Sequence, residues 1–92
     1  MGFEWDVAKA KANFRNHGVR FEESKAVFDD PHAISVADDE ADPSEERFVS
    51  IGMGALGRVL VVVYTYRGDN IRIISARLAA AHERAEREAG LP

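Results

Sequence analysis

The chain has 92 residues, of which 46% are hydrophobic and 30% charged, and it contains no cysteine. A chain of this length builds one core, so we expect a single domain over residues 1–92, and the lack of cysteine excludes disulfides, thiolate metal sites and cysteine nucleophiles. The longest apolar run, Val59–Tyr64, is far shorter than the roughly 20 residues that cross a bilayer, and no signal-peptide pattern opens the sequence, so we expect a cytoplasmic protein with no membrane partner.

The net charge of −4 is unevenly distributed along the chain. Residues 22–46 contain one basic and ten acidic residues, whereas residues 47–77 contain five arginines and one aspartate. Such segregation predicts one surface that receives a basic partner and another that binds anions. The overall negative charge argues against tight nonspecific binding to duplex DNA.

The first part of the chain predicts a short strand and two helices. Apolar residues alternate in Phe3–Asp6, which favours a strand, and Asp6 is a good N-cap for a helix over Val7–His17. Apolar residues recur in that segment at helical spacing, and Gly18 ends it in a left-handed conformation. A second helix is expected over Glu22–Phe28, stopped by the aspartates and proline that follow.

Four strands and a last helix are predicted for the remainder. The strands are expected at 32–36, 47–53, 59–65 and 71–75, with an acidic loop after the first strand and the run Val59–Val63 at the centre of the sheet. An Ala-, Glu- and Arg-rich helix is expected over 76–88. The order β-α-α-β-β-β-β-α predicts an α+β domain in which helices cover one face of a small, largely antiparallel sheet and leave the other face open.

Arginines near strand ends are the main candidates for chemistry. Strand alternation predicts Ser75 and Arg77 on one side of the last strand with Ile73, and Arg72 on the other side, while Arg67 lies across the hairpin end from Arg72. The guanidinium fork matches phosphate oxygens, so these arginines suit RNA backbone binding or stabilisation of a transition state. The alternative is that they are solvated or pair with the acidic loop.

Residues for proton transfer are marked less clearly. Glu46 is a candidate general base and Arg47 a phosphate ligand, although the two equally fit a salt bridge. His82, on the last helix, is the better acid or base among the three histidines, the alternative being a solvent-facing role. The histidines lack metal-ligand spacing and the acidic loop lacks a calcium-binding pattern, so no metal or cofactor is expected.

Eight short blocks occur in order along the chain. They are Phe3-Glu4-Trp5-Asp6, Asn13 with His17-Gly18-Val19, Phe21-Glu22-Glu23, Val27-Phe28-x-Asp30-Pro31, Glu45-Glu46-Arg47, Ile51-Gly52, Tyr64-Thr65-x-Arg67 and Arg72-Ile73-Ile74-Ser75-Ala76-Arg77. Together they resemble the BrnT toxins of bacterial type II toxin–antitoxin pairs, from residue 3 to about residue 88. The resemblance implies a RelE-like fold and a ribonuclease that blocks translation. It also implies neutralisation by a BrnA-type antitoxin with a ribbon-helix-helix domain, DNA binding only through that antitoxin, and a heterotetramer of two toxins and two antitoxins.

RNA cleavage without a metal requires a deprotonated 2′-hydroxyl, stabilisation of the phosphorane charge and protonation of the leaving oxygen. Given the resemblance, we expect the scissile phosphate to contact the arginines and Ser75, with Glu46, Glu83 and His82 available for proton transfer. The expected catalytic residues are Arg67, Arg77, Ser75, Glu46, Arg47 and His82, and the expected substrate-binding residues are Arg72 and Lys9.

Two positions depart from the pattern of the BrnT toxins. Asn16 stands where lysine often precedes the His-Gly pair, and Arg87 stands where a tyrosine is frequent. If either position contributes to cleavage, activity is weakened here. The alternative function is a catalytically weak binding module that acts as antitoxin partner and co-repressor, and a third possibility is an α+β domain without activity.

Overall fold

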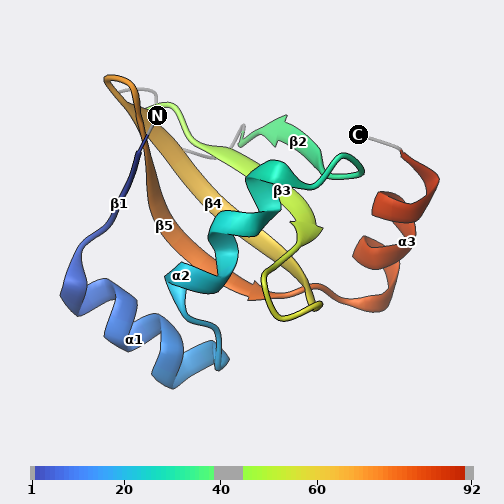
Figure 1. The fold of residues 1–92 in the computed structure, drawn as a ribbon, viewed down its shortest axis with the longest axis horizontal. Helices are drawn as coiled ribbons and strands as arrows, with labels where there is room; N and C mark the ends of the chain where they lie inside the picture. The colour runs from blue at the N-terminus through green and yellow to red at the C-terminus, as the bar shows by residue number, and fades with distance from the viewer. Residues whose placement is uncertain (1, 39–44, 91–92) are drawn as a thin grey trace.

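The computed structural model describes residues 2–38 and 45–90. Five strands form one sheet in the order β1-β5-β4-β3-β2, with β1 parallel to β5 and the other neighbours antiparallel (Figure 1). Their bounds are β1 Phe3–Glu4, β2 Ile34–Ala37, β3 Phe48–Met53, β4 Val59–Arg67 and β5 Asn70–Leu78. The predicted α+β class, the element order and the central position of the valine-rich strand are confirmed.

The helices begin and end at residues with recognisable capping chemistry. Helix α1 spans Val7–His17, as predicted: the Asp6 carboxylate accepts a hydrogen bond from the Lys9 amide, and Gly18 has a φ of 69°. The second helix divides into α2, Phe21–Ser24, and a 3₁₀ helix, η1, over Lys25–Asp29. Among the described residues, no helix is long and apolar enough to cross a membrane.

The main core lies between the sheet and the first two helices. Side chains of β4 and β5 that point toward α1, α2 and η1 form this face of the sheet, which we call the helical face. Its buried residues are Val19, Phe21, Val27, Leu60, Val62, Tyr64, Ile71, Ile73 and Ala76. Burial of these aliphatic and aromatic side chains is the principal source of stability.

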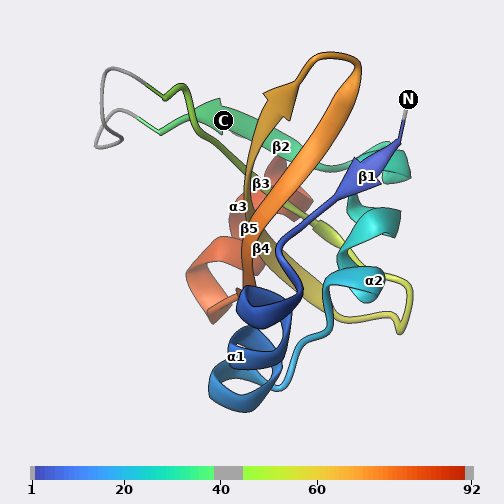
Figure 2. The same ribbon diagram turned by 90° about the vertical axis from the view of Figure 1, so that its left-hand side faces the viewer.

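The opposite face, which we call the open face, carries the alternate side chains of β4, such as Val61 and Val63. A smaller cluster there contains Ile51, Val61 and Ala79. Helix α3, Ala81–Ala89, contacts β3, and Figure 2 shows it on the side of the sheet away from α2. It has no buried residue, so this face is covered only in part. The predicted placement of the helices on one face is therefore wrong for α3.

Helix α3 is tied to the rest of the fold by ion pairs. The Arg87 guanidinium, one of the two departures from the BrnT pattern, donates two hydrogen bonds to Asp30, at 2.8 and 3.1 Å, and both side chains are at most 14% exposed. Asp30 also accepts from the backbone amides of Met53 and His32. The Arg87 pairing first, and these amides, hold the pKa of Asp30 well below its usual range.

A register shift interrupts the pairing of β4 with β5. Val63 pairs with Ser75, whereas the next residue of β4, Tyr64, pairs with Ile73. Ile74 is therefore an extra residue in β5, as in a β-bulge. The alternation of side chains along β5 reverses at this point.

Because of this bulge, the predicted sides of β5 are wrong. Ala76, not Ser75, joins Ile73 in the core of the helical face. Ser75 and Arg77 lie on the open face, together with Arg72, from which strand alternation had separated them. The predicted start of the last helix is also wrong, since residues up to Leu78 pair with β4 and α3 begins only at Ala81.

Asn13 connects α1 to the segment beyond the bulge. Its side-chain amide donates to the carbonyls of Val19, at 2.9 Å, and Ala76, at 2.8 Å, and its oxygen accepts from the Ala76 amide at 3.1 Å. All three bonds are buried. Because β1 pairs with β5 only at Ile71 and Arg72, Asn13 supplies the partners of the Ala76 backbone groups further along this edge of β5.

We expect Asn13→Ala to lower the free energy of unfolding by roughly 2–4 kcal/mol, because it leaves three buried backbone groups without partners. Urea unfolding followed by circular dichroism measures the change. The control is Asn16→Ala, an exposed position on the same helix. Equal midpoints for the two variants would show that the Asn13 bonds contribute nothing net.

Candidate functional site

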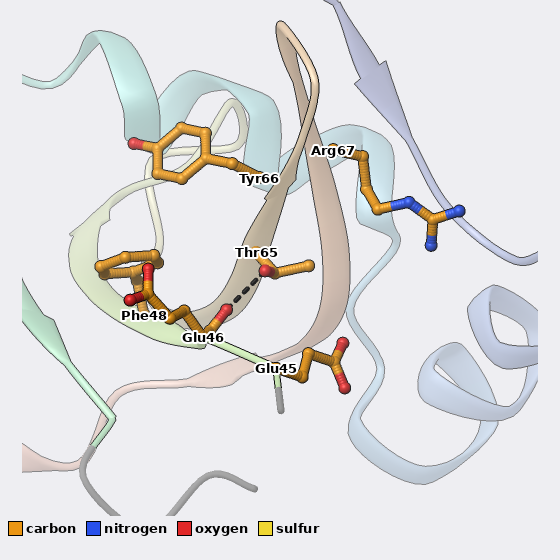
Figure 3. A pocket seen from close by; sticks show the side chains of 6 residues that line it. All are labelled: Glu45, Glu46, Phe48, Thr65, Tyr66 and Arg67. Atoms are coloured by element: carbon orange, nitrogen blue, oxygen red, sulfur yellow. Dashed lines mark hydrogen bonds between the residues drawn. The ribbon is translucent and has the colours of Figure 1, made fainter. Parts of the chain in front are cut away.

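An open cleft of about 520 Å³ lies at one end of the sheet (Figure 3). Because β3 begins at Phe48, opposite Tyr64, the last residues of β4 extend past it and leave this space. The Thr65 hydroxyl donates to the Glu46 carbonyl and joins the two segments. The cleft is lined by Glu45, Glu46, Phe48, Thr65, Tyr66 and Arg67.

The side chains that line this cleft point to two opposite sides. Tyr66, Phe48 and Glu46 project to one side, and Arg67 and Glu45 project to the other (Figure 3). This division follows strand alternation, since neighbouring residues of an extended chain face opposite ways. The cleft therefore presents an aromatic and carboxylate side and an arginine side.

The arginine side continues along the open face of the sheet. Arg67 is 61% exposed, and its Nε lies 3.9 Å from Glu4, whereas Arg72 donates to the same carboxylate at 3.2 Å. A hydrogen bond from Asn70, together with Arg72 and Arg67, lowers the pKa of Glu4. One ionised carboxylate thus faces two guanidinium groups, which leaves an excess of positive charge.

Arg47 and Glu45 form a second pair, of which Glu45 lines the cleft. The Arg47 Nη2 donates to the Glu45 Oε2 at 3.3 Å, and both side chains are more than one-third exposed. From the sequence, Glu46 was the carboxylate predicted to act or pair with Arg47. Here the neighbouring Glu45 is the carboxylate on the arginine side, because Glu46 points the other way.

Arg77 lies far from Arg67 on the same face. In the register it stands opposite Val61, six residues before Arg67 on β4, a separation of about 20 Å along the strand. Both terminal nitrogens of Arg77 donate to Glu83 at 2.8 Å. The expected joint contact of Arg67 and Arg77 with one phosphate is therefore not formed in this arrangement, although both lie on the open face.

Three other predicted site residues stand apart. Lys9 is an exposed residue of α1, which covers the helical face, whereas Arg67, Arg72 and Arg77 lie on the open face. His82 is exposed at the start of α3, next to Glu83 and remote from the cleft. Ser75 is half-buried in β5, on the open face opposite Val63.

The aromatic residues of the cleft are not among the site residues predicted from the sequence. Tyr66 is 53% exposed, and its ring lies 5.5 Å from that of Phe48 and 5.8 Å from that of Tyr64. Partial burial, followed by the neighbouring Tyr64 phenol, raises the pKa of Tyr66, so its hydroxyl stays protonated at neutral pH. The alternation of Tyr64 and Tyr66 was visible in the sequence, but their proximity to Phe48 depends on the strand register.

Over residues 2–38 and 45–90, no group of three or more histidine, aspartate or glutamate side chains is placed to hold a metal ion. Two acidic residues of the predicted acidic surface are also engaged internally. Glu23 accepts a fork of hydrogen bonds from Arg58, at 2.5 and 2.8 Å, and Asp30 is paired with Arg87. Residues 39–44, in the centre of the acidic loop, lie outside the described residues.

The fold has a counterpart among solved structures. The 1.1 Å crystal structure of the Brucella abortus ribonuclease toxin BrnT is similar, with a TM-score of 0.68 and 24% sequence identity over 87% of this chain and 97% of that chain. A search of curated proteins found no match. The structural likeness defines a small α+β fold that a ribonuclease toxin also adopts.

The family follows from the sequence itself. Residues 5–83 match the family described as the ribonuclease toxin, BrnT, of type II toxin–antitoxin systems. The chain therefore belongs to the BrnT family of ribonuclease toxins.

The Arg77–Glu83 pair makes stability dependent on pH. Hydrogen bonds from Arg77, and one from the Ala80 amide, lower the pKa of Glu83 from 4.5 to about 2. A lowered carboxylate pKa adds stability above pH 4.5 that is lost as the pH falls to about 2. The exposed Arg77 is screened by water, so we expect Glu83→Gln to cost about 1–2 kcal/mol at pH 7.

Denaturant unfolding at several pH values tests this expectation. The difference between the parent protein and Glu83→Gln is expected to shrink as the pH falls from 4.5 to about 2, whereas Glu88→Gln, at an exposed position of the same helix, follows the parent protein throughout. A difference that does not change with pH would assign the effect to the shape of the side chain.

Proposed function

We propose that this chain is a metal-independent RNA endonuclease that arrests translation in the cytoplasm and is neutralised by a BrnA-type antitoxin. The observation that carries the proposal is the exposed Arg67, which lines the cleft. The Glu45 carboxylate projects to the same side of the cleft as Arg67. Family membership supplies the reaction class, and the arginines supply the charge that this reaction needs.

In the proposed reaction Arg67 and Arg47 bind the scissile phosphate. The Glu45 carboxylate removes the proton of the 2′-hydroxyl, and the resulting oxygen attacks the adjacent phosphorus. The bond to the 5′-oxygen breaks, and that oxygen takes a proton from water. The products are a 2′,3′-cyclic phosphate and a 5′-hydroxyl end. The arginines stabilise the additional negative charge that the phosphorane carries.

Glu4 and Arg72 act as positioning residues in this proposal. Glu4 holds Arg72 and lies close to Arg67, so its carboxylate fixes the direction from which the guanidinium groups approach the phosphate. An exposed carboxylate is a weak base at neutral pH. Much of the rate enhancement is therefore assigned to orientation of the RNA strand and to charge, and cleavage of messenger RNA accounts for the arrest of translation.

The partner we propose is an antitoxin with a ribbon-helix-helix domain, joined in a complex of two toxins and two antitoxins. DNA is bound only through the antitoxin. The described acidic residues that stay exposed, such as Glu22, Asp29 and Glu46, suit a basic segment of that partner. A second function, that of a catalytically weak antitoxin partner and co-repressor, is favoured by the exposure of Glu45, the carboxylate on the arginine side of the cleft.

We expect Arg67→Ala to lower the rate of RNA cleavage by roughly 100-fold or more, because it removes a charged donor to the phosphorane. Arg67→Lys keeps the charge but loses the planar fork, so an intermediate rate is expected. Cleavage of an end-labelled RNA measures the rates, in parallel with growth after induction. Activity is expected to persist in EDTA.

The matched control is Arg15→Ala, an exposed arginine of α1 on the other side of the sheet. It is expected to cleave RNA and stop growth like the parent protein. Equal cleavage by Arg67→Ala and Arg15→Ala would refute the assignment of the site. A folded parent protein that binds the antitoxin but cleaves no RNA would favour the co-repressor function.

Antitoxin binding is expected to weaken as salt concentration rises, since charge complementarity is screened. Co-expression with the adjacent gene, followed by light scattering, is expected to give the mass of two toxins and two antitoxins. Affinity that is independent of salt would contradict the role of the acidic surface.

A further inference from the structure

The side of the cleft that faces away from Arg67 has no role in the reaction described above. It contains Tyr66 and Phe48, whose rings lie 5.5 Å apart and are inclined at 66°. The inclined rings of Tyr66 and Phe48 form a corner. A planar group that stacks on one ring therefore places its own edge against the other ring. More than half of the Tyr66 side chain is exposed, which leaves a ring surface free for such a group.

A carboxylate completes this corner. The Glu46 side chain projects to the same side as the two rings (Figure 3). Its backbone carbonyl is held by the Thr65 hydroxyl, which fixes the residue that carries the carboxylate. Within the described part of the chain, the Glu46 carboxylate has no hydrogen bond or ion pair of its own. Its two oxygens are exposed hydrogen-bond acceptors beside the rings of Tyr66 and Phe48.

We propose that this corner binds an unpaired guanine base of the RNA strand, an inference that rests on the proposed ribonuclease function. The base stacks on Tyr66 and packs against Phe48, as single-stranded bases do on aromatic side chains. The two oxygens of Glu46 accept hydrogen bonds from the N1–H and the N2 amino group on the Watson–Crick edge of guanine. Glu46 thus becomes a specificity residue instead of the general base that the sequence analysis predicted.

The chemistry of the bases selects guanine among the four. An ionised carboxylate is an acceptor only. Guanine presents two adjacent donors on one edge, whereas adenine and cytosine each present one donor next to an acceptor, and uracil presents one donor between two acceptors. Only guanine therefore satisfies both oxygens without placing an acceptor against the carboxylate.

The positions of Tyr66 and Arg67 connect this base site to the phosphate site. They are consecutive residues, so their Cα atoms are about 3.8 Å apart, and their side chains face opposite ways at the end of β4. Since β4 extends past the start of β3 here, an RNA strand can cross the cleft from one side to the other. The base recognised by Glu46 then lies next to the phosphate bound by Arg67.

Equilibrium binding tests the site without any cleavage. The probes are 2′-O-methyl oligouridines that carry one central guanine, inosine or adenine, since methylation blocks attack by the 2′-oxygen. The parent protein is expected to bind the guanine probe roughly 10-fold more tightly than the inosine probe, which lacks only the N2 amino group. Glu46→Gln is expected to remove this preference, and Glu88→Gln, which exchanges an exposed carboxylate on α3, is expected to keep it.

Aromatic substitutions separate stacking from hydrogen bonding. Tyr66→Ala is expected to weaken binding of all three probes by roughly 10-fold, and Tyr66→Phe is expected to bind like the parent protein. Tyr66 is more than half exposed, so the melting temperature is sufficient to check that each variant is folded. With unmethylated RNA, cleavage is expected next to guanine in the parent protein and at more varied positions in Glu46→Gln.

The outcomes distinguish the two proposals. Binding of guanine, inosine and adenine probes with equal affinity, or an unchanged preference in Glu46→Gln, would overturn the guanine site. Cleavage that depends on Arg67 but has no base preference would overturn the guanine site alone. Guanine-selective binding without cleavage of unmodified RNA would overturn the ribonuclease proposal and support the base site.

Discussion

Three hydrogen bonds of the buried Asn13 side chain, two donated and one accepted, determine how this fold is connected. They join α1, the segment that leads into α2, and β5 beyond its bulge. Strand β1 pairs with β5 only as far as Arg72, so the Ala76 backbone groups on that edge of β5 have no strand partner. Asn13 binds both of these groups, just beyond the bulge that places Ala76 in the core and Ser75 and Arg77 on the open face. The composition of both faces depends on this arrangement.

Local signals in the sequence were sufficient for much of the fold. The bounds of α1 followed from Asp6 and Gly18, and the central strand followed from its run of valines. The bulge could not be predicted, because it is a property of the pairing between two strands. Alternation alone therefore assigned Ser75 and Arg77 to the wrong side. The final helix was extended for a related reason, since an alanine-rich sequence has helical propensity but the pairing of β5 with β4 prevails up to Leu78.

The candidate site was predictable in its chemistry but not in its geometry. The sequence identified Arg67, Arg72 and Arg47, and the fold places their strand segments around the same end of the sheet. It could not decide between Glu45 and Glu46, because adjacent residues differ only in the side to which they point. Tyr66 was not predicted as a site residue, because its role in the cleft depends on contact with Phe48. Phe48 is distant from it in sequence and lies close only through the strand register.

Helix α3 is attached by ion pairs and not by a packed apolar surface, which bears on how freely its sequence can change. The match to the BrnT family ends at residue 83, the glutamate that binds Arg77, whereas the helix continues to Ala89. None of its residues is buried, and the Arg87 contact with Asp30 is made by charge instead of shape. The exposed positions of such a segment tolerate substitution at little cost to the core, whereas loss of Arg87 leaves the almost buried Asp30 carboxylate without this partner. The exposed residues of α3 are thus free to change while the sheet and its arginines stay in place.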